Sequence, residues 1–178
     1  MVANPNVPAN DQGLPYLALE QIEALTGRLV QAVDGVSDEA GIVHQKGDVR
    51  FGKLRPALGK VFLAEAPGRG SSELVVLRPD REKMDPLFLK FVLLSQPFVE
   101  FATIGSYGSK MPRTSWEQLS QFRFRPPKIE IQVEIAKGLE KKLGQIDLTI
   151  DNLRMSVDLL NERRQALITA AVTGQLEI

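Results

Sequence analysis

The sequence of 178 residues contains no cysteine and a single histidine, His44. The lack of cysteine excludes disulfides, cysteine nucleophiles and thiolate metal sites, and it is typical of proteins in a reducing cytosol. One histidine cannot supply a histidine triad or a histidine-rich metal site within one chain. Turn-forming residues surround His44, so we expect it to lie on the surface and to have no catalytic role.

Long apolar runs and cofactor fingerprints are missing as well. No apolar run approaches the ~18 residues that suggest a membrane helix, and the first residues form no secretory signal pattern. Residues 68–72 lack the Gly-Lys-Ser/Thr ending of a phosphate-binding loop, and no glycine fingerprint for a dinucleotide or S-adenosylmethionine is present. Asp48, Lys53 and Glu73 lack the acid-x-Lys spacing of a nuclease site. We therefore expect a non-catalytic chain without cofactor or metal that does not enter a membrane.

The last third of the chain is dominated by one pattern. Proline is absent from residues 130–171, and apolar residues there recur at alternating spacings of four and three. This repeat predicts one helix of roughly 40 residues, about 60 Å long at 1.5 Å per residue. Its apolar seam needs a second helix, and the rest of the sequence offers none of comparable length. We expect a coiled coil, although a structural spacer would show the same pattern. The seam consists of Leu139, Leu143, Ile146, Ile150, Leu153, Val157, Leu160, Leu167 and Ala171, interrupted at Arg164.

Residues 14–128 contain shorter elements of both types, so we predict an α+β fold. We expect strands within 14–19, 49–51, 61–64, 74–77 and 122–125, and helices at 20–25, 86–94 and 98–104. Asp85 followed by Pro86 marks a helix start, and Ser115 with Gln118 predicts the capping box of a further short helix. Residues 68–72 and 105–112 are expected to be loops. The predicted organisation is a mobile tail at 1–13, a globular domain at 14–128 and a long helix at 129–178.

The net charge is zero, but two stretches, residues 46–60 and 110–128, are basic. Both lie in segments that we expect to be too irregular for the core. Cations contact the phosphates of nucleic acids, and Arg, Lys, Ser and Tyr side chains also reach base edges. A solvated face would have a similar composition, and this alternative stays open at this point. The candidate DNA-binding residues are Lys53, Arg55, Lys60, Tyr107, Ser109, Lys110 and Arg113.

Several strings of residues carry a resemblance to a known family. They are LPYLALEQIE (14–23) with TGRL (26–29), GDVRFGKLRP (47–56) with GKV (59–61), KMPRTSW (110–116) and LNERRQALITAAVTGQL (160–176). In this order the strings resemble the specificity subunit of type I restriction–modification systems. The resemblance covers nearly the whole chain from about Leu14, and the last string is its most specific part.

The resemblance implies a role as well as a fold. Family members have mixed α/β target-recognition domains joined to long conserved helices, and they bind double-stranded DNA without catalysing a reaction. A complete subunit has two recognition domains and two antiparallel helices, which direct methyltransferase subunits to a bipartite site. The methyltransferase binds S-adenosylmethionine and methylates an adenine, and a restriction nuclease subunit joins for cleavage. A cytoplasmic, prokaryotic protein is implied.

This chain has one such domain and one such helix, so the resemblance implies half a subunit. A natural half, a truncated gene and a fragment remain as alternatives. We expect half subunits to form a homodimer through the long helix. The rival expectation is an interaction protein with a decayed recognition domain, whose helix docks methyltransferase or specificity subunits without reading DNA. An enzyme is the third reading, which the missing site residues oppose.

Overall fold

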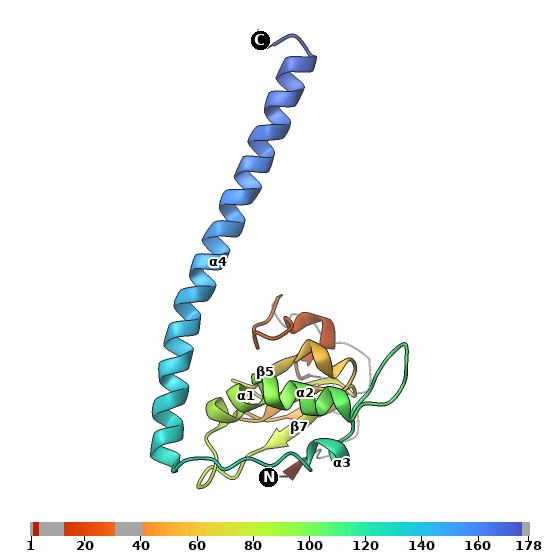
Figure 1. Ribbon diagram of the computed structural model, residues 1–178, viewed down its shortest axis with the longest axis vertical. Coiled ribbons are helices and arrows are strands. Elements are labelled where there is room, and N and C mark those ends of the chain that lie inside the picture. The colour runs from red at the N-terminus through yellow and green to blue at the C-terminus, as the bar shows by residue number, and fades with distance from the viewer. Residues whose placement is uncertain (1, 4–12, 31–40, 176–178) are drawn as a thin grey trace. The chain divides into compact units, whose positions relative to one another are not determined.

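The computed structural model describes residues 2–3, 13–30 and 41–175, which divide into two units at residues 1–136 and 137–178. The first unit contains two β-sheets (Figure 1). One has the strand order β1-β7-β4-β5 with antiparallel neighbours, and the other has the order β2-β6-β3. The strands are β1 (Val2–Ala3), β2 (Tyr16–Leu17), β3 (Gly41–His44), β4 (Val49–Gly52), β5 (Val61–Leu63), β6 (Gly68–Ser71) and β7 (Leu74–Arg78).

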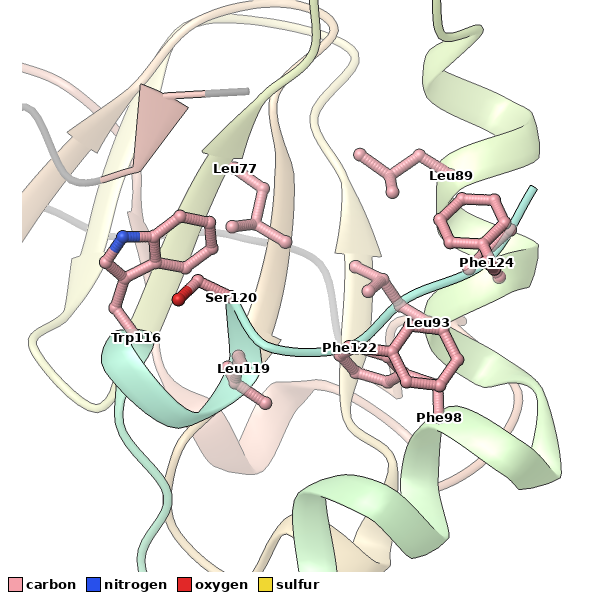
Figure 2. Close-up of a pocket in the computed structure, with 10 residues that line it drawn as sticks. Leu77, Leu89, Leu93, Phe98, Trp116, Leu119, Ser120, Phe122 and Phe124 are labelled. Atoms are coloured by element: carbon pink, nitrogen blue, oxygen red, sulfur yellow. The ribbon is translucent and has the colours of Figure 1, made fainter. Parts of the chain in front are cut away.

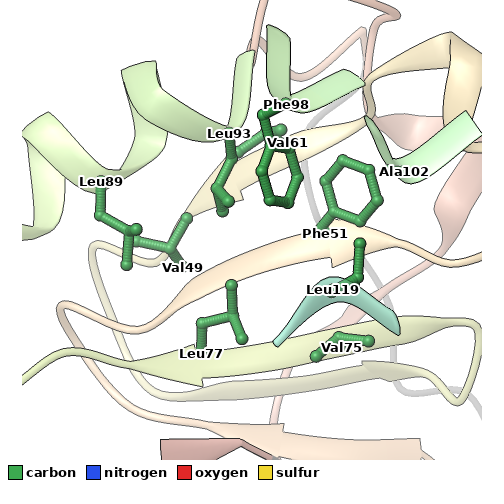
Figure 3. Close-up of a cluster of buried hydrophobic side chains, with 10 residues drawn as sticks. All are labelled: Val49, Phe51, Val61, Val75, Leu77, Leu89, Leu93, Phe98, Ala102 and Leu119. Carbon is green, nitrogen blue, oxygen red and sulfur yellow. The ribbon is translucent and has the colours of Figure 1, made fainter. Parts of the chain in front are cut away.

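Three short helices contribute to the main core of this unit. They are α1 (Pro86–Leu94), α2 (Gln96–Ile104) and α3 (Trp116–Leu119). Asp85 caps α1 by accepting a 2.8 Å hydrogen bond from the Phe88 backbone N–H, and Ser115 caps α3 by accepting from Gln118 N at 3.3 Å. Both caps agree with the sequence prediction. The core in Figure 3 consists of Val49, Phe51, Val61, Val75, Leu77, Leu89, Leu93, Phe98, Ala102 and Leu119.

The alternation of side chains along β4 separates this core from the second sheet. Val49 and Phe51 point into the main core. Arg50 points to the opposite side of the strand, where its guanidinium contacts His44 of β3. A Cβ at Gly70 of β6 would collide with Leu17 O and would lie 2.5 Å from Arg50 Nη1. The two sheets therefore approach closely at a glycine, with an arginine between them.

Several predicted elements are wrong. Residues 68–72 were expected to be a loop, but Gly68–Ser71 is the buried strand β6, in which glycine permits a close approach that larger residues would block. The strand β3 was not predicted. The helix expected at 20–25 is instead the 3₁₀ turn η1, Leu19–Gln21. Residues 122–125 form no strand, although Phe122 still packs inward while Arg123 and Arg125 are exposed. Most of the predicted tail at 1–13 lies outside the described residues.

The long helix α4 spans Ile129–Val172, 44 residues, close to the predicted limits. Its first turns belong to the first unit, where Gln132 and Ala136 are buried. The Gln132 side chain accepts from Asp85 N at 3.0 Å and donates to Lys83 O at 3.0 Å and Pro127 O at 2.8 Å. The predicted α+β class and the long C-terminal helix are confirmed.

The described α-helices range from the four residues of α3 to the 44 residues of α4. None of them alone is long and apolar enough to cross a membrane. The consecutive helices α1 and α2, which are bent by 61° relative to each other, together match a broken membrane span in length and composition only. Leu89, Leu93, Phe98 and Ala102 of this pair are buried in the core, which accounts for their apolar composition.

Candidate nucleic-acid interface

The two basic stretches, residues 46–60 and 110–128, are joined in the structure at residues 53–55 and 112–114. The segment after β4 pairs with the segment before α3 through an isolated bridge between Leu54 and Arg113. Main-chain hydrogen bonds run from Arg55 N to Pro112 O at 2.7 Å and from Thr114 N to Lys53 O at 3.0 Å. Lys53 and Arg55 therefore lie on one loop segment, and Arg113 lies on the segment hydrogen-bonded to it.

The loop between α2 and α3 extends away from the sheets (Figure 1). Tyr107 and Arg113 close it, since each N–H donates to the other residue's carbonyl at 2.9 and 2.8 Å. Gly108 has φ of 95°, a conformation that favours glycine. Between these ends, Ser109, Lys110 and Met111 are exposed, as is Tyr107. We call residues 107–113 the tip loop.

A third segment joins this region through Glu73 in the turn between β6 and β7. Its carboxylate oxygen Oε1 lies 3.0 Å from Arg113 Nη2, and its backbone carbonyl accepts from Lys53 N at 2.7 Å. The side chains of the pair are 26% and 48% exposed, so water screens the attraction and the pair orients more than it stabilises. Glu73 thereby holds Arg113 against the segment that carries Lys53.

We call the side chains that these contacts bring together the basic surface. Four cations, an aromatic ring and a hydroxyl make it up: Lys53, Arg55, Lys110, Arg113, Tyr107 and Ser109. Lys60, the remaining predicted DNA-binding residue, is partly buried, and its Nζ donates to Leu19 O at 2.8 Å. The structure thus places six of the seven predicted residues in one region and ties Lys60 to the chain near η1.

Arg50, which contributes to the first basic stretch in the sequence, is fully buried. Its Nη1 donates to His44 Nδ1 at 2.8 Å, and its Nη2 lies 3.4 Å from Ile42 O. Arginine always donates, so neutral His44 accepts at Nδ1 and carries its proton on Nε2. The expected surface position of His44 is therefore wrong: His44 is 5% exposed, because β3 turns it toward Arg50.

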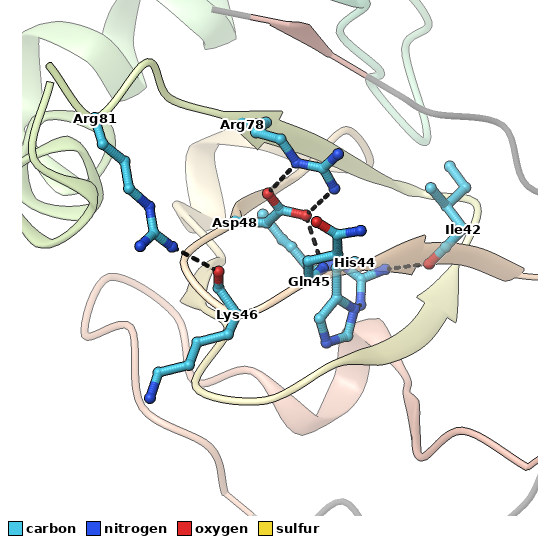
Figure 4. Close-up of polar contacts among 8 residues, drawn as sticks. Ile42, His44, Gln45, Lys46, Asp48, Arg78 and Arg81 are labelled. Atoms are coloured by element: carbon cyan, nitrogen blue, oxygen red, sulfur yellow. Dashed lines mark hydrogen bonds and ion pairs between the residues drawn. The ribbon is translucent and has the colours of Figure 1, made fainter. Parts of the chain in front are cut away.

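Burial and the nearby Arg50 cation lower the pKa of His44 from 6.5 to about 4. Burial also lowers the pKa of Arg50 to about 10. Asp48 lies next to this pair (Figure 4) and binds Arg78 with both oxygens, at 2.8 Å each. Burial alone would raise the pKa of Asp48, but hydrogen bonds from Arg78 and Gln45 N outweigh it and hold the pKa below its usual value. The Arg50–His44 contact joins the two sheets, whereas the Asp48–Arg78 pair links β7 to the turn before β4.

The two carboxylates considered above, Asp48 and Glu73, each pair with an arginine. Asp48 binds Arg78, and Glu73 binds Arg113. No group of three or more His, Cys, Asp or Glu side chains that could hold a metal ion occurs among the residues that the structure describes.

The first unit also has an apolar pocket of about 260 Å³ (Figure 2). Phe122 and Phe124 line it together with Trp116 and the inner faces of α1 and α2. Its lining is apolar apart from Ser120 and the ring nitrogen of Trp116. Such a lining offers nothing to a phosphate, so the pocket is a loosely filled margin of the core and not part of the basic surface.

The second unit exposes the predicted seam. Seam residues from Leu139 to Leu167 are between 38% and 63% exposed, and Ile150, Leu153 and Val157 line one shallow groove with Arg154 and Asp158. Leu148, Met155 and Leu159 are 60–66% exposed at positions outside the seam. The helix therefore presents a long apolar stripe that is not covered by any described residue of this unit, up to residue 175.

Comparisons with known proteins agree with these features. Residues 9–154 match the family described as the type I restriction modification DNA specificity domain. The chain is 26% identical over 165 residues to the type I restriction enzyme EcoDI specificity subunit of Escherichia coli, covering 90% of this chain and 36% of that protein.

Two solved structures share the fold. The HsdS subunit from Thermoanaerobacter tengcongensis matches 97% of this chain and 46% of its own at 20% identity, with a TM-score of 0.68. A chain from a structure of complex assembly and conformational transition in the type I R-M system matches 87% of this chain and 43% of its own at 21% identity, with a TM-score of 0.66. This chain thus spans between a third and a half of the length of these relatives.

The family match covers most of the chain, and its description agrees with the predicted non-catalytic role in DNA recognition. The order of the elements, one sheet-containing domain followed by one long helix, is the arrangement that the resemblance implied. The chain therefore belongs to the type I restriction–modification DNA specificity family and has one recognition domain.

Proposed function

We propose that the basic surface binds double-stranded DNA and reads one half of a bipartite site. The observation that supports this most is the joining of the two basic stretches by main-chain hydrogen bonds between residues 53–55 and 112–114. A solvated face needs no such joining, because isolated surface cations are stable anywhere on a protein. The joined segments cluster cations in one region, and such clustering is the electrostatic footprint of a nucleic-acid-binding surface.

The residues of this surface divide by position. Cations at its base, Lys53 and Arg113, suit phosphate contacts, which fix the position of a protein on the duplex. The tip loop carries Tyr107, Ser109 and Lys110 on an exposed projection, and such side chains form hydrogen bonds with base edges in the major groove. Lys60 is a peripheral phosphate contact in this proposal, since its ammonium group already donates to Leu19 O.

The partners follow from the family. The relatives are specificity subunits of restriction systems, and we propose that this chain directs a type I adenine methyltransferase to its site. S-adenosylmethionine is bound by that partner and not by this chain, and the restriction nuclease subunit joins the same complex. The adenine must leave the duplex for methylation, so the specificity subunit has to hold the DNA while the partner acts.

The seam of α4 supports a homodimer in this proposal. One helix leaves its apolar stripe in water, whereas a second copy in antiparallel register covers it and restores two recognition domains. Two identical domains related by a two-fold axis would read two inverted half-sites. The proposed target is therefore a palindromic sequence with a central gap.

The decisive experiment combines methylation mapping with single substitutions. The chain is expressed with its methyltransferase subunit, and the methylated motif is mapped by sequencing host DNA with and without this gene. Lys53→Ala, Lys110→Ala and Arg113→Ala should each weaken DNA binding. Lys46→Ala is the matched control, because Lys46 is exposed in the same basic stretch but precedes β4, whereas Lys53 follows it.

The rival function is a docking protein that binds methyltransferase or specificity subunits through α4 without reading DNA. It predicts that the three substitutions and the control behave alike, while partner binding persists. It also predicts no motif that depends on this gene. A motif that depends on this gene, with binding lost in the substituted proteins but not in the control, would exclude that rival.

A further inference from the structure

Arg55 differs from the other cations of the basic surface in its backbone conformation. Its φ and ψ are 50° and 63°, in the left-handed region that side chains other than glycine rarely adopt. Pro56 follows it, and a proline further restricts the residue that precedes it. A glycine would adopt this conformation without steric cost. The arginine at this position therefore opposes folding.

The surrounding backbone holds Arg55 in place. Arg55 N donates to Pro112 O at 2.7 Å, and Arg55 O accepts from Leu58 N at 2.9 Å. Leu54, its neighbour, bridges Arg113. The N–H of Arg55 is thus bonded to the tip loop and its carbonyl to the turn that follows it, which fixes the point from which its side chain projects.

The Arg55 side chain contributes nothing to these bonds. It is exposed, and within the described part of the chain it makes no hydrogen bond or ion pair. The stability of the fold does not explain why a strained residue without side-chain contacts occupies this position. Strained residues are often found at functional sites. The guanidinium of Arg55 is therefore available to a ligand, and a binding role would account for an arginine at this position.

We propose, on the basis of the function above, that Arg55 is a fixed phosphate clamp that sets the register of the recognition domain on DNA. The guanidinium offers a planar pair of N–H groups that bind a phosphate with two hydrogen bonds. Arg55 lies at the foot of the tip loop, beside Pro112, whereas Ser109 and Lys110 lie at the end of the loop. When the end of the loop enters a groove, its foot meets the sugar–phosphate backbone beside that groove. Arg55 is then a positioning residue, and the tip loop makes the choice of bases.

The test uses three variants in the full chain with its methyltransferase subunit. Arg55→Gly removes the cation and relieves the backbone, and Arg55→Lys keeps the charge but loses the bidentate geometry. Leu25→Gly is the matched control: Leu25 also has positive φ, at 62°, and is 58% exposed, but it lies outside the basic surface. Binding to duplexes with and without the mapped motif is measured against salt concentration, and the melting temperature is measured for each protein.

Arg55→Gly should bind both duplexes about 10-fold to 100-fold more weakly, as expected for a lost charged hydrogen bond. Its salt slope should fall by about one, its melting temperature should not fall, and its methylated motif should be unchanged. Arg55→Lys should keep the salt slope and lose less affinity. Leu25→Gly should keep the affinity and the slope of the unmodified protein.

Three results would overturn the proposal. Unchanged affinity of Arg55→Gly would show that the guanidinium binds nothing. A motif that relaxes at one position would make Arg55 a base-reading residue. A melting temperature several degrees lower would assign it a structural role. The proposed function fails separately, if the unmodified protein shows no preference for its motif.

Discussion

The guanidinium of Arg50 donates a 2.8 Å hydrogen bond to Nδ1 of His44, across the gap between the two β-sheets. This bond requires a neutral imidazole, because a protonated Nδ1 cannot accept and would place two cations in contact. Both residues are buried, and Arg50 Nε has no partner among the described residues. The pair therefore makes the join between the sheets sensitive to pH.

The first prediction concerns this sensitivity. The folded pKa of His44 is about 4 and the unfolded value is 6.5, so the unfolded chain binds the additional proton between these values. Stability from this group is complete above pH 6.5 and is lost as the pH falls toward 4, by on the order of 2–3 kcal/mol. Urea unfolding at pH 7, 5.5 and 4.5 measures it.

His44 is the only histidine in the sequence, so His44→Gln provides a clean control. Glutamine can still offer an oxygen to Arg50 but does not titrate. The variant should be less stable than the unmodified protein at pH 7. Its free energy of unfolding should depend much less on pH between pH 6.5 and 4.5. A slope equal to that of the unmodified protein would mean that other groups cause the pH dependence.

The second prediction concerns Gln132. Its side chain satisfies a backbone N–H and two carbonyls, and it is 1% exposed. Gln132→Ala leaves these groups without a partner and should lower the free energy of unfolding by about 2 kcal/mol. Gln145→Ala, at an exposed position of the same helix, should change it by less than about 0.5 kcal/mol. Equal effects of the two substitutions in chemical denaturation would contradict the anchoring role of Gln132.

The third prediction compares two glycines. Gly70→Ala places a methyl group against Leu17 O and the Arg50 guanidinium, and should destabilise the protein by about 3 kcal/mol. Gly138→Ala lies in α4, where a Cβ would meet nothing within 4 Å. That change should stabilise α4 by about 0.5–1 kcal/mol, because alanine favours helix more than glycine does. Thermal unfolding measures both, and opposite signs are expected.

The fourth prediction concerns the seam. Ile150→Asp with Leu153→Asp should convert the proposed dimer to monomers, because two carboxylates would be buried in the helix contact. Leu148→Asp with Leu159→Asp is the matched control, since both residues are exposed on α4 but lie outside the seam. Sedimentation equilibrium distinguishes the two outcomes. If the unmodified chain is already a monomer at micromolar concentration, the proposed dimer does not exist.

The fifth prediction concerns the direction of pairing, and the cysteine-free sequence makes it simple to test. In an antiparallel dimer with full overlap of the seam, only residues near its middle meet their own copies. Leu153→Cys should then form an intermolecular disulfide, whereas Leu139→Cys and Leu167→Cys should not. Efficient cross-linking at all three positions would indicate parallel helices.

Features with a local cause were predictable from the sequence. Asp85 and Pro86 marked the start of α1, and Gly105 marked the end of α2. The proline-free stretch 130–171 agrees with α4 to within one residue at each end, whereas the predicted segment 129–178 extends past the last helical residue, Val172. Each of these depends on chemistry within one or two turns of the chain. The irregular segment predicted at 105–112 was also placed correctly, because Gly105, Gly108 and Pro112 disfavour regular structure.

Features that depend on distant partners were not predictable. Gly68–Ser71 has the composition of a loop, and only its position between β2 and β3 makes it a strand. Arg50 looked like one more surface cation, because nothing nearby in the sequence shows that β4 turns it toward His44. For the same reason the sequence suggested two basic stretches but not that Leu54 and Arg113 join them.

The segments that form the basic surface are held together mostly by hydrogen bonds between main-chain atoms. Tyr107 with Arg113, Arg55 with Pro112, and Lys53 with Thr114 are held by amides and carbonyls, which every residue other than proline supplies in full. Side chains at Ser109, Lys110 and Met111 take no part in them. A change of side chain at these three positions leaves these main-chain bonds intact. Under the proposed function, a new DNA target would therefore be acquired by point substitution on an unchanged scaffold.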